Sequence, residues 1–168
     1  DDGPATAAHL NMPSDVQVAP NGDLYIADMH HNRIRKVDVK TGLITTVAGS
    51  GAFGDAGDNG PGIKASLAGP AGLALVPEGK GLSIYIADYY NGLVRVVGAD
   101  GIIRRVTDEG HVAFGAPTRV AIDGKAGWMY VADAATDRVV AQVLPKASRT
   151  PFQILPRQTT APAGRKLS

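Results

Sequence analysis

Three aspartates recur at the same place in a repeated pattern and are the first candidates for chemistry. Asp28, Asp88 and Asp133 each close a five-residue segment that reads apolar, Tyr, apolar, Ala, Asp. A ring of such carboxylates could hold a cation or a basic partner. Turn carboxylates also accept backbone N–H groups or pair with arginines, and here Arg33 and Arg138 follow two of them. Because the position recurs in every repeat, we favour a structural turn role for these five residues.

The loops after these aspartates carry aromatic and histidine pairs. His30-His31 follows Asp28, and Tyr89-Tyr90 follows Asp88. Adjacent histidines beside an aspartate could ligate a metal, but neighbouring side chains in a turn point apart, so exposed loop histidines are favoured. Matching aromatic loops suit contact with a ligand or peptide, with packing over the sheet edge as the alternative. The candidate binding residues are therefore His30, His31, Asn32, Tyr89, Tyr90, Asn91 and Thr136.

A glycine-rich stretch from Gly49 to Pro61 separates the first two repeats. Its Asp55, Asp58 and Asn59 cluster hard oxygen ligands that could bind calcium, whereas the favoured interpretation is a flexible connector. The sequence carries no Ser-His-Asp order, no carboxylate pair of defined spacing and no metal-binding motif. We therefore assign no catalytic residue, no metal site and no cofactor, with Ca²⁺ or another divalent ion as the alternative.

Composition indicates one globular unit. The chain has 168 residues, of which 44% are hydrophobic and 20% charged, enough for a real core. The net charge of +1 gives no field that would attract nucleic acid or a membrane. Basic residues are expected on solvated outer strands rather than on an RNA-binding face. They are Arg33, Arg35, Lys36, Arg95 and Arg104-Arg105.

Cysteine is absent, which excludes disulfides, thiolate catalysis and zinc–thiolate sites. No apolar run approaches the ~18 residues that span a bilayer as a helix. The first residue is Asp1 rather than an initiator Met, which is compatible with a cleaved leader. The cellular location stays open, with a secreted or periplasmic location among the alternatives.

The elements that must position these residues are short strands. Apolar and polar residues alternate with a period of two, helical periodicity is absent, and Asn21-Gly22 between apolar runs predicts a hairpin turn. The expected strands are, in the first repeat, 15–19, 23–27, 32–38 and 43–48; in the second, 71–76, 82–87, 93–97 and 102–106; and in the third, 118–122, 128–132, 138–143 and 151–155.

The repeats divide the chain into segments. We expect a linker remnant at 1–12, repeat units at 13–49, 70–107 and 108–155, a glycine-rich linker at 50–69 and a polar tail at 156–168. The remnant is expected because Asp2-Gly3-Pro4 echoes Asn59-Gly60-Pro61. Self-similarity at such a period is typical of a repeat architecture.

These motifs resemble the NHL-repeat family of β-propellers. The resemblance covers about residues 1–145 and lies in Pro13, Asn21-Gly22, Tyr25 to Asp28 and Asn32 to Ile34, with a linker similar to those of bacterial and teneurin-type NHL proteins. It implies an all-β fold of about three four-stranded antiparallel blades. Gly92-Leu93 replaces the Asn-Arg pair in the second repeat. The family includes RNA-binding, protein-binding and enzymatic members, so the resemblance says little about function.

Three blades are too few to close a propeller, which usually has about four to eight. We expect half of a six-bladed ring, completed by a second chain as a homo-oligomer or by missing repeats. The first functional hypothesis is a module that binds a protein, peptide or glycan. The second is a lyase- or lactonase-like enzyme with a divalent metal near the channel, where Asp15, Gln17, Arg119 and Asp123 lie on the expected inner strands. The third is a fragment that only folds and assembles.

Overall fold

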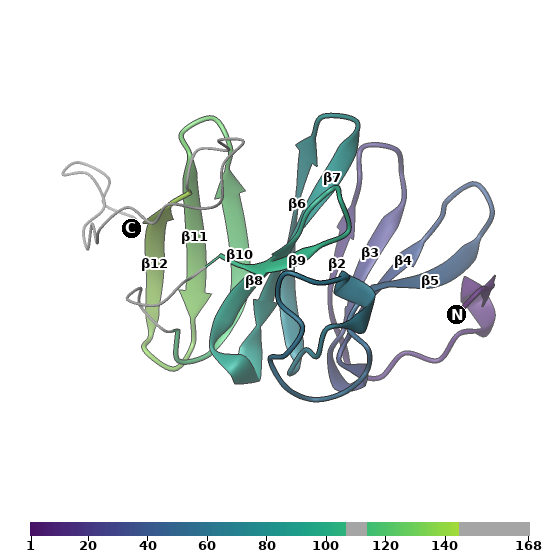
Figure 1. Cartoon of the computed structure of the whole chain (residues 1–168), viewed down its shortest axis with the longest axis horizontal. Coiled ribbons are helices and arrows are strands. Elements are labelled where there is room, and N and C mark those ends of the chain that lie inside the picture. Colours follow the sequence, from purple (N-terminus) through teal and green to yellow (C-terminus); the bar gives the residue numbers. More distant parts are fainter. Residues whose placement is uncertain (107–113, 145–168) are drawn as a thin grey trace.

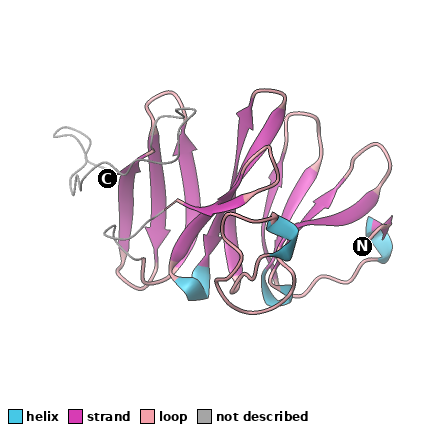
Figure 2. Cartoon of the chain, viewed as in Figure 1, coloured by secondary structure: helices cyan, strands magenta, loops and turns pink. Residues whose placement is uncertain are grey.

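The structure is a computed structural model that describes residues 1–106 and 114–144. These residues form an all-β fold, with three antiparallel sheets side by side and short 3₁₀ turns between some of the strands (Figures 1 and 2). Each sheet is one blade, and its innermost strand lies against the innermost strand of the next blade. No described helix is long and apolar enough to cross a membrane.

Blade 1 has the strand order β1-β5-β4-β3-β2. Its strands are β1 (Gly3–Pro4), β2 (Pro13–Val18), β3 (Leu24–Asp28), β4 (Arg33–Val37) and β5 (Leu43–Ala48). The 3₁₀ turns η1 (Ala5–Ala7) and η2 (Met29–His31) precede β2 and β4. Residues 1–12, expected as a linker remnant, thus contribute an edge strand.

Blade 2 has the order β6-β7-β8-β9, and blade 3 has β10-β11-β12 within the described residues. The strands of blade 2 are β6 (Pro70–Glu78), β7 (Gly81–Asp88), β8 (Leu93–Val97) and β9 (Ile103–Arg105), with the turns η3 (Gly62–Lys64) and η4 (Tyr89–Asn91). Those of blade 3 are β10 (Pro117–Asp123), β11 (Trp128–Asp133) and β12 (Arg138–Val143). The expected fourth strand at 151–155 and the tail at 156–168 lie outside the described residues.

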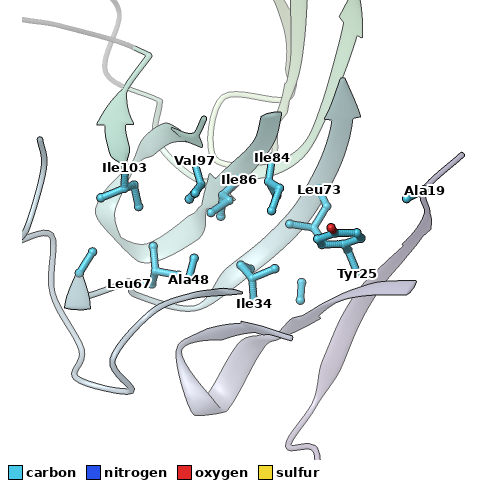
Figure 3. Close-up of a cluster of buried hydrophobic side chains, with 12 residues drawn as sticks. Ala19, Tyr25, Ile34, Ala48, Leu67, Leu73, Ile84, Ile86, Val97 and Ile103 are labelled. Carbon is cyan, nitrogen blue, oxygen red and sulfur yellow. The ribbon is translucent and has the colours of Figure 1, made fainter. Parts of the chain in front are cut away.

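Each blade has two faces, because side chains alternate along a strand. We call the face that packs on the next blade the forward face, and the opposite one the rear face. In blade 1 the forward face carries Tyr25, Ala27 and Ile34, which join the same core as Leu73 and Ile86 from the rear face of blade 2 (Figure 3). Burying each large apolar side chain contributes about 1.5–3 kcal/mol.

The second core repeats this arrangement one blade further on. Val94 and Val96 from the forward face of blade 2 pack with Val120, Met129 and Val131 from the rear face of blade 3. The chain therefore contains the same interface twice, always forward face on rear face.

The linker between blades 1 and 2 belongs to the first core, since Ala65 and Leu67 are fully buried in it. Asn59 N donates to the Ile103 carbonyl at 2.8 Å, as Asp2 N donates to the Ile44 carbonyl at 2.9 Å in blade 1. Residues 1–12 and 58–69 are thus structural counterparts, each running along the rear face of the blade that follows it.

Candidate functional site

The three recurring aspartates end β3, β7 and β11 at the same end of the blades, the lower end in Figure 1. Asp28 and Asp88 are fully buried, and Asp133 nearly so. Each carboxylate accepts a backbone N–H from the segment just before its blade. The donors are Asn11 N to Asp28 Oδ1 at 2.8 Å, Ala68 N to Asp88 Oδ1 at 2.7 Å and Ala116 N to Asp133 Oδ1 at 2.7 Å.

Each aspartate has a second partner three residues later in the loop. His31 Nδ1 lies 2.9 Å from Asp28 Oδ2, Asn91 Nδ2 donates to Asp88 Oδ2 at 2.8 Å, and Thr136 Oγ1 donates to Asp133 Oδ2 at 3.0 Å. Three residues of the candidate binding set therefore have a common structural role. They fix the loop to the end of its own blade.

A buried arginine completes this arrangement in blades 1 and 2. Arg95 has no exposed surface; its Nη2 lies 2.6 Å from Asp58 Oδ1 and its Nη1 lies 3.6 Å from Asp88 Oδ2. Arg35 bridges Asp1 and Asp28 in the same way, at 2.7 and 3.2 Å. Each arginine thus forms an Asp–Arg–Asp triad. The triad joins the segment that precedes the blade to the end of β3 in blade 1 and of β7 in blade 2.

These triads correct two predictions from the sequence. Asp28 pairs with Arg35, whereas Arg33 donates to the Ser50 carbonyl at 3.0 Å; Arg138 is exposed in the turn before β12. Arg35 and Arg95 were expected on a solvated outer face, but both are buried. The reason is that they lie on the rear face of β4 and β8, where the linker covers them and supplies a carboxylate.

Blade 3 replaces the arginine with neutral donors. Val140 pairs with Val131, the register position that Arg95 occupies opposite Ile86 in blade 2. Burial alone raises the pKa of Asp133, but hydrogen bonds from Gly115 N, Ala116 N, Thr136 and Ala135 N outweigh it and hold the pKa below 3.8.

Asp88 has the opposite shift. Its burial raises the pKa from 3.8 to about 6, against the hydrogen bonds from Ala68 and Asn91 and the charge of Arg95. Burial prevails because Arg95 is engaged mainly with Asp58, through Nε at 2.9 Å and Nη2 at 2.6 Å.

We expect the ¹³Cγ shift of Asp88 to titrate near pH 6 and that of Asp133 below 3.8. A midpoint for Asp88 at or below 4 would contradict this.

The shift has a defined sign for stability. The folded state binds the Asp88 proton more tightly than the unfolded chain, whose aspartate titrates near 3.8. The contribution to the free energy of unfolding is therefore fully present below pH 3.8 and is lost as the pH rises through about 6. With about 1.4 kcal/mol for each pH unit, the loss is about 3 kcal/mol.

Ion pairs also hold the glycine-rich linker. Arg105 pairs with Asp58 and, at 2.8 Å, with Asp55, while Arg95 Nη1 donates to the Ser66 carbonyl at 2.5 Å. The stretch is thus attached to blade 2 at several points, rather than being the flexible connector expected from its composition. The carboxylates considered for calcium face guanidinium groups, which repel a cation.

An exposed aromatic patch lies on this loop end, formed by Phe53, Tyr89 and Tyr90. The ring centroids of Phe53 and Tyr90 are 5.8 Å apart, and Tyr89 meets Tyr90 edge-on at 4.8 Å and 87°. Phe53 is 68% exposed and Tyr90 57%. Asn91 Nδ2 donates to the Gly54 carbonyl at 2.7 Å and so fixes the Phe53 segment beside the tyrosines.

Phe53 was not among the residues singled out from the sequence. It lies 36 positions before Tyr89 in a glycine-rich stretch without strand periodicity, so no local signal placed it near the tyrosines. The linker also approaches Tyr90 closely: Gly69 has a φ of +61°, and a Cβ there would lie 2.5 Å from Tyr90 Cδ2. The ring therefore lies directly over the linker backbone.

Two further candidates, His30 and Asn32, belong to the loop between β3 and β4. His30 is exposed, and its backbone N donates to the Asn11 carbonyl at 3.1 Å. Asn32 adopts a left-handed φ of +53° and links two parts of the linker, accepting from Gly69 N at 3.0 Å and donating to the Gly51 carbonyl at 3.4 Å. Both residues thus tie the first loop to neighbouring segments.

The polar residues of the inner strands hold the blades together. Arg119 on β10 donates to the Ala71 carbonyl at 2.6 Å and to the Ser14 carbonyl at 3.0 Å, so one side chain spans all three blades. Asp15 Oδ2 accepts from Leu73 N of the next blade at 2.8 Å. No group of three or more His, Cys, Asp or Glu side chains that could hold a metal occurs in residues 1–106 and 114–144.

Comparison with known proteins agrees with the repeat architecture. The NHL repeat family matches residues 10–37. The chloroplastic protein SUPPRESSOR OF QUENCHING 1 of Arabidopsis thaliana is 33% identical over 96 residues, which is 57% of this chain and 9% of that protein. This chain therefore spans a small part of the curated relative.

Solved structures share the fold. An auxiliary nutrient binding protein from Bacteroides ovatus superposes with a TM-score of 0.62 and 23% identity, covering 74% of this chain and 35% of that one. The virginiamycin B lyase of Staphylococcus aureus gives 0.53 and 16%, covering 84% and 41%. At these identities the likeness shows the fold alone, and this chain spans about a third to two fifths of either protein.

Proposed function

We propose that this chain, which carries an NHL repeat at residues 10–37 and has the β-propeller fold, is a binding module whose loop end holds a peptide or protein partner. Blades joined by two apolar cores form a rigid support, and loops on rigid supports are where repeat proteins place their binding residues. The match to the Arabidopsis relative does not support any particular activity, since this chain covers 9% of that protein.

The aromatic patch is the observation that carries this proposal. Aromatic side chains are enriched among the residues that dominate binding energy, and they lose little conformational freedom on binding. Phe53 and Tyr90 are exposed, yet their positions are fixed by the Asn91–Gly54 hydrogen bond and by the linker beneath Tyr90. A preorganised aromatic surface lowers the entropic cost of capturing a flexible peptide.

Two other functions fit the residues less well. A glycan could also stack on the aromatic patch, and the binding experiment includes it. A lyase-like activity is named among the structural neighbours, but that likeness is one of fold. The inner-strand residues that such an enzyme would use, Asp15 and Arg119, contact backbone groups of adjacent blades instead.

To test this proposal, a random dodecapeptide library displayed on phage is selected for binding to the immobilised chain. Enriched peptides are synthesised, and their affinity is measured for the wild type and for the Phe53→Ala, Tyr90→Ala double variant. We expect at least a tenfold loss of affinity, because removing one hot-spot side chain costs about 2 kcal/mol or more. A glycan array probes the alternative ligand class.

Val39→Ala is the matched control, since Val39 is an exposed apolar residue in the β4–β5 turn, at the end of blade 1 opposite to the η2 loop, and should leave affinity unchanged. Peptides that bind the double variant as well as the wild type would place binding elsewhere. If no peptide is enriched and only glycans are retained, the peptide proposal is wrong and the glycan alternative replaces it.

We also propose that the chain assembles with copies of itself to complete the ring. The support is that, in the part of the chain that the structure describes, the three blades leave one blade face open at each end of the row, and apolar residues lie on both faces. Six blades fall within the range at which propellers close.

A further inference from the structure

The two faces of a blade are chemically different, and the chain uses them in one order only. Forward-face residues of blade 1 pack on rear-face residues of blade 2, and forward-face residues of blade 2 pack on rear-face residues of blade 3. Among residues 1–106 and 114–144, the rear face of blade 1 and the forward face of blade 3 have no blade packed on them. These are the two kinds of face that already fit each other twice.

The leftover rear face is apolar. In blade 1 it carries Val16, Val18, Leu24, Ile26 and Val37, which are neighbours across β2, β3 and β4. Val16 is 56% exposed, whereas its blade 2 counterpart Leu73 is buried at 2%. Val18 is also exposed, whereas its counterpart Leu75 is half-buried. The same positions are therefore covered when a preceding blade is present.

The leftover forward face is its complement. In blade 3 it carries Ala121, Tyr130, Ala132, Val139 and Ala141, paired across β10, β11 and β12. Val139 is 59% exposed, while Ile34 and Val94, which occupy the same register position in blades 1 and 2, are fully buried.

We infer that the forward face of blade 3 docks on the rear face of blade 1 of a second copy, in the same sense as the two internal interfaces. This inference rests on the assembly part of the proposed function. A head-to-tail contact of this kind closes into a ring if the rotation per chain allows it. Two copies with three sheets each would supply six blades, which is within the range at which propellers close.

The internal interfaces predict which residues meet. Tyr25 on the forward face of blade 1 lies against Leu73 on the rear face of blade 2 in Figure 3. By register, Tyr130 is the counterpart of Tyr25, and Val16 is the counterpart of Leu73. Tyr130 of one copy should therefore contact Val16 of the other.

The chain has no cysteine, so single cysteines can report this contact without background. The experiment compares Val16→Cys, Tyr130→Cys and the double variant, each treated with a short bis-maleimide cross-linker, after light scattering has given the mass in solution. We expect twice the chain mass of 17.4 kDa in solution and cross-linked dimers in the double variant or in a mixture of the two single variants. Each single variant alone should remain uncross-linked.

Val16→Glu provides a second measurement, with Val39→Glu as the control because both valines are 56% exposed. Val16→Glu should weaken dimerisation by at least a hundredfold, since it places a charge in both copies of the contact, and Val39→Glu should leave dimerisation unchanged.

Three outcomes would contradict the inference. Dimers that cross-link in a single-cysteine variant would mean that like faces meet, which overturns this geometry while assembly stands. Dimers unaffected by Val16→Glu also overturn it. A monomer would mean that other blades cover these faces, and would overturn both assembly and docking.

Discussion

Replacing Arg95 with methionine should lower the free energy of unfolding by about 3–5 kcal/mol, because breaking a buried ion pair leaves its partner charge uncompensated. Arg95 is fully buried between Asp58 and Asp88, and methionine fills much of its volume without its charge. The Asp88 carboxylate would then be desolvated without a cation, so its pKa should rise further above 6. Urea denaturation measures the loss of stability, and ¹³C chemical shifts follow Asp88.

Arg104→Met is the matched control. Arg104 pairs with Asp100 at 2.7 Å, but both side chains are substantially exposed. Exposed pairs contribute between zero and about 1 kcal/mol, so this variant should be nearly as stable as the wild type. Equal losses in the two variants would mean that the triad is no more stabilising than a surface pair.

The second large effect is expected at Gly49, which follows β5 at the start of the linker. Gly49→Ala should destabilise the protein by about 3 kcal/mol or more, from a left-handed backbone and from overpacking. Its φ is +86°, and a Cβ there would lie 2.1 Å from the Asn32 carbonyl oxygen and 3.0 Å from Arg33 Cα. Both obstacles are backbone atoms, so no side-chain rotation relieves the clash.

Gly42→Ala separates the two causes. Gly42 has a φ of +71° but no atom within 4 Å of the added Cβ. It should lose only about 1–2 kcal/mol, the cost of the left-handed conformation. Thermal or urea denaturation of both variants gives the comparison. If Gly49→Ala is no worse than Gly42→Ala, the close approach to Asn32 does not constrain the fold.

Strands β2 to β12 could be predicted from the sequence to within two residues, because their signals are local, whereas β1 was expected as part of a linker. Pro13, Pro70 and Pro117 begin inner strands, and the repeated Tyr-containing segment ends at a buried aspartate in every blade. The period of two and the turn residues are read within a few positions of each other. That locality is why the β-propeller prediction and the resemblance to NHL repeats were confirmed.

The candidate site was predicted less completely, because its contacts are long-range. Arg95 reaches Asp58 across 37 residues, and Phe53 reaches Tyr90 across the same number. Nothing in the alternation of β8 distinguishes an arginine facing solvent from one covered by a linker. Charge pairing therefore had to be seen in three dimensions, and the sequence alone assigned Arg33 where Arg35 is the partner.

The linker contacts bear on how such a chain can be duplicated or recombined. Asp58 and Ala68 lie before blade 2, yet they hold Arg95 and Asp88 inside it, as Asp1 and Asn11 hold Arg35 and Asp28 in blade 1. A segment cut out at the first strand of a blade would lose the linker aspartate that pairs with its buried arginine and the linker N–H that binds its buried aspartate. The unit that can be duplicated is therefore a linker together with the sheet that follows it. Viable recombination between such genes should place the crossover upstream of the linker, which for blade 2 is near Ala56.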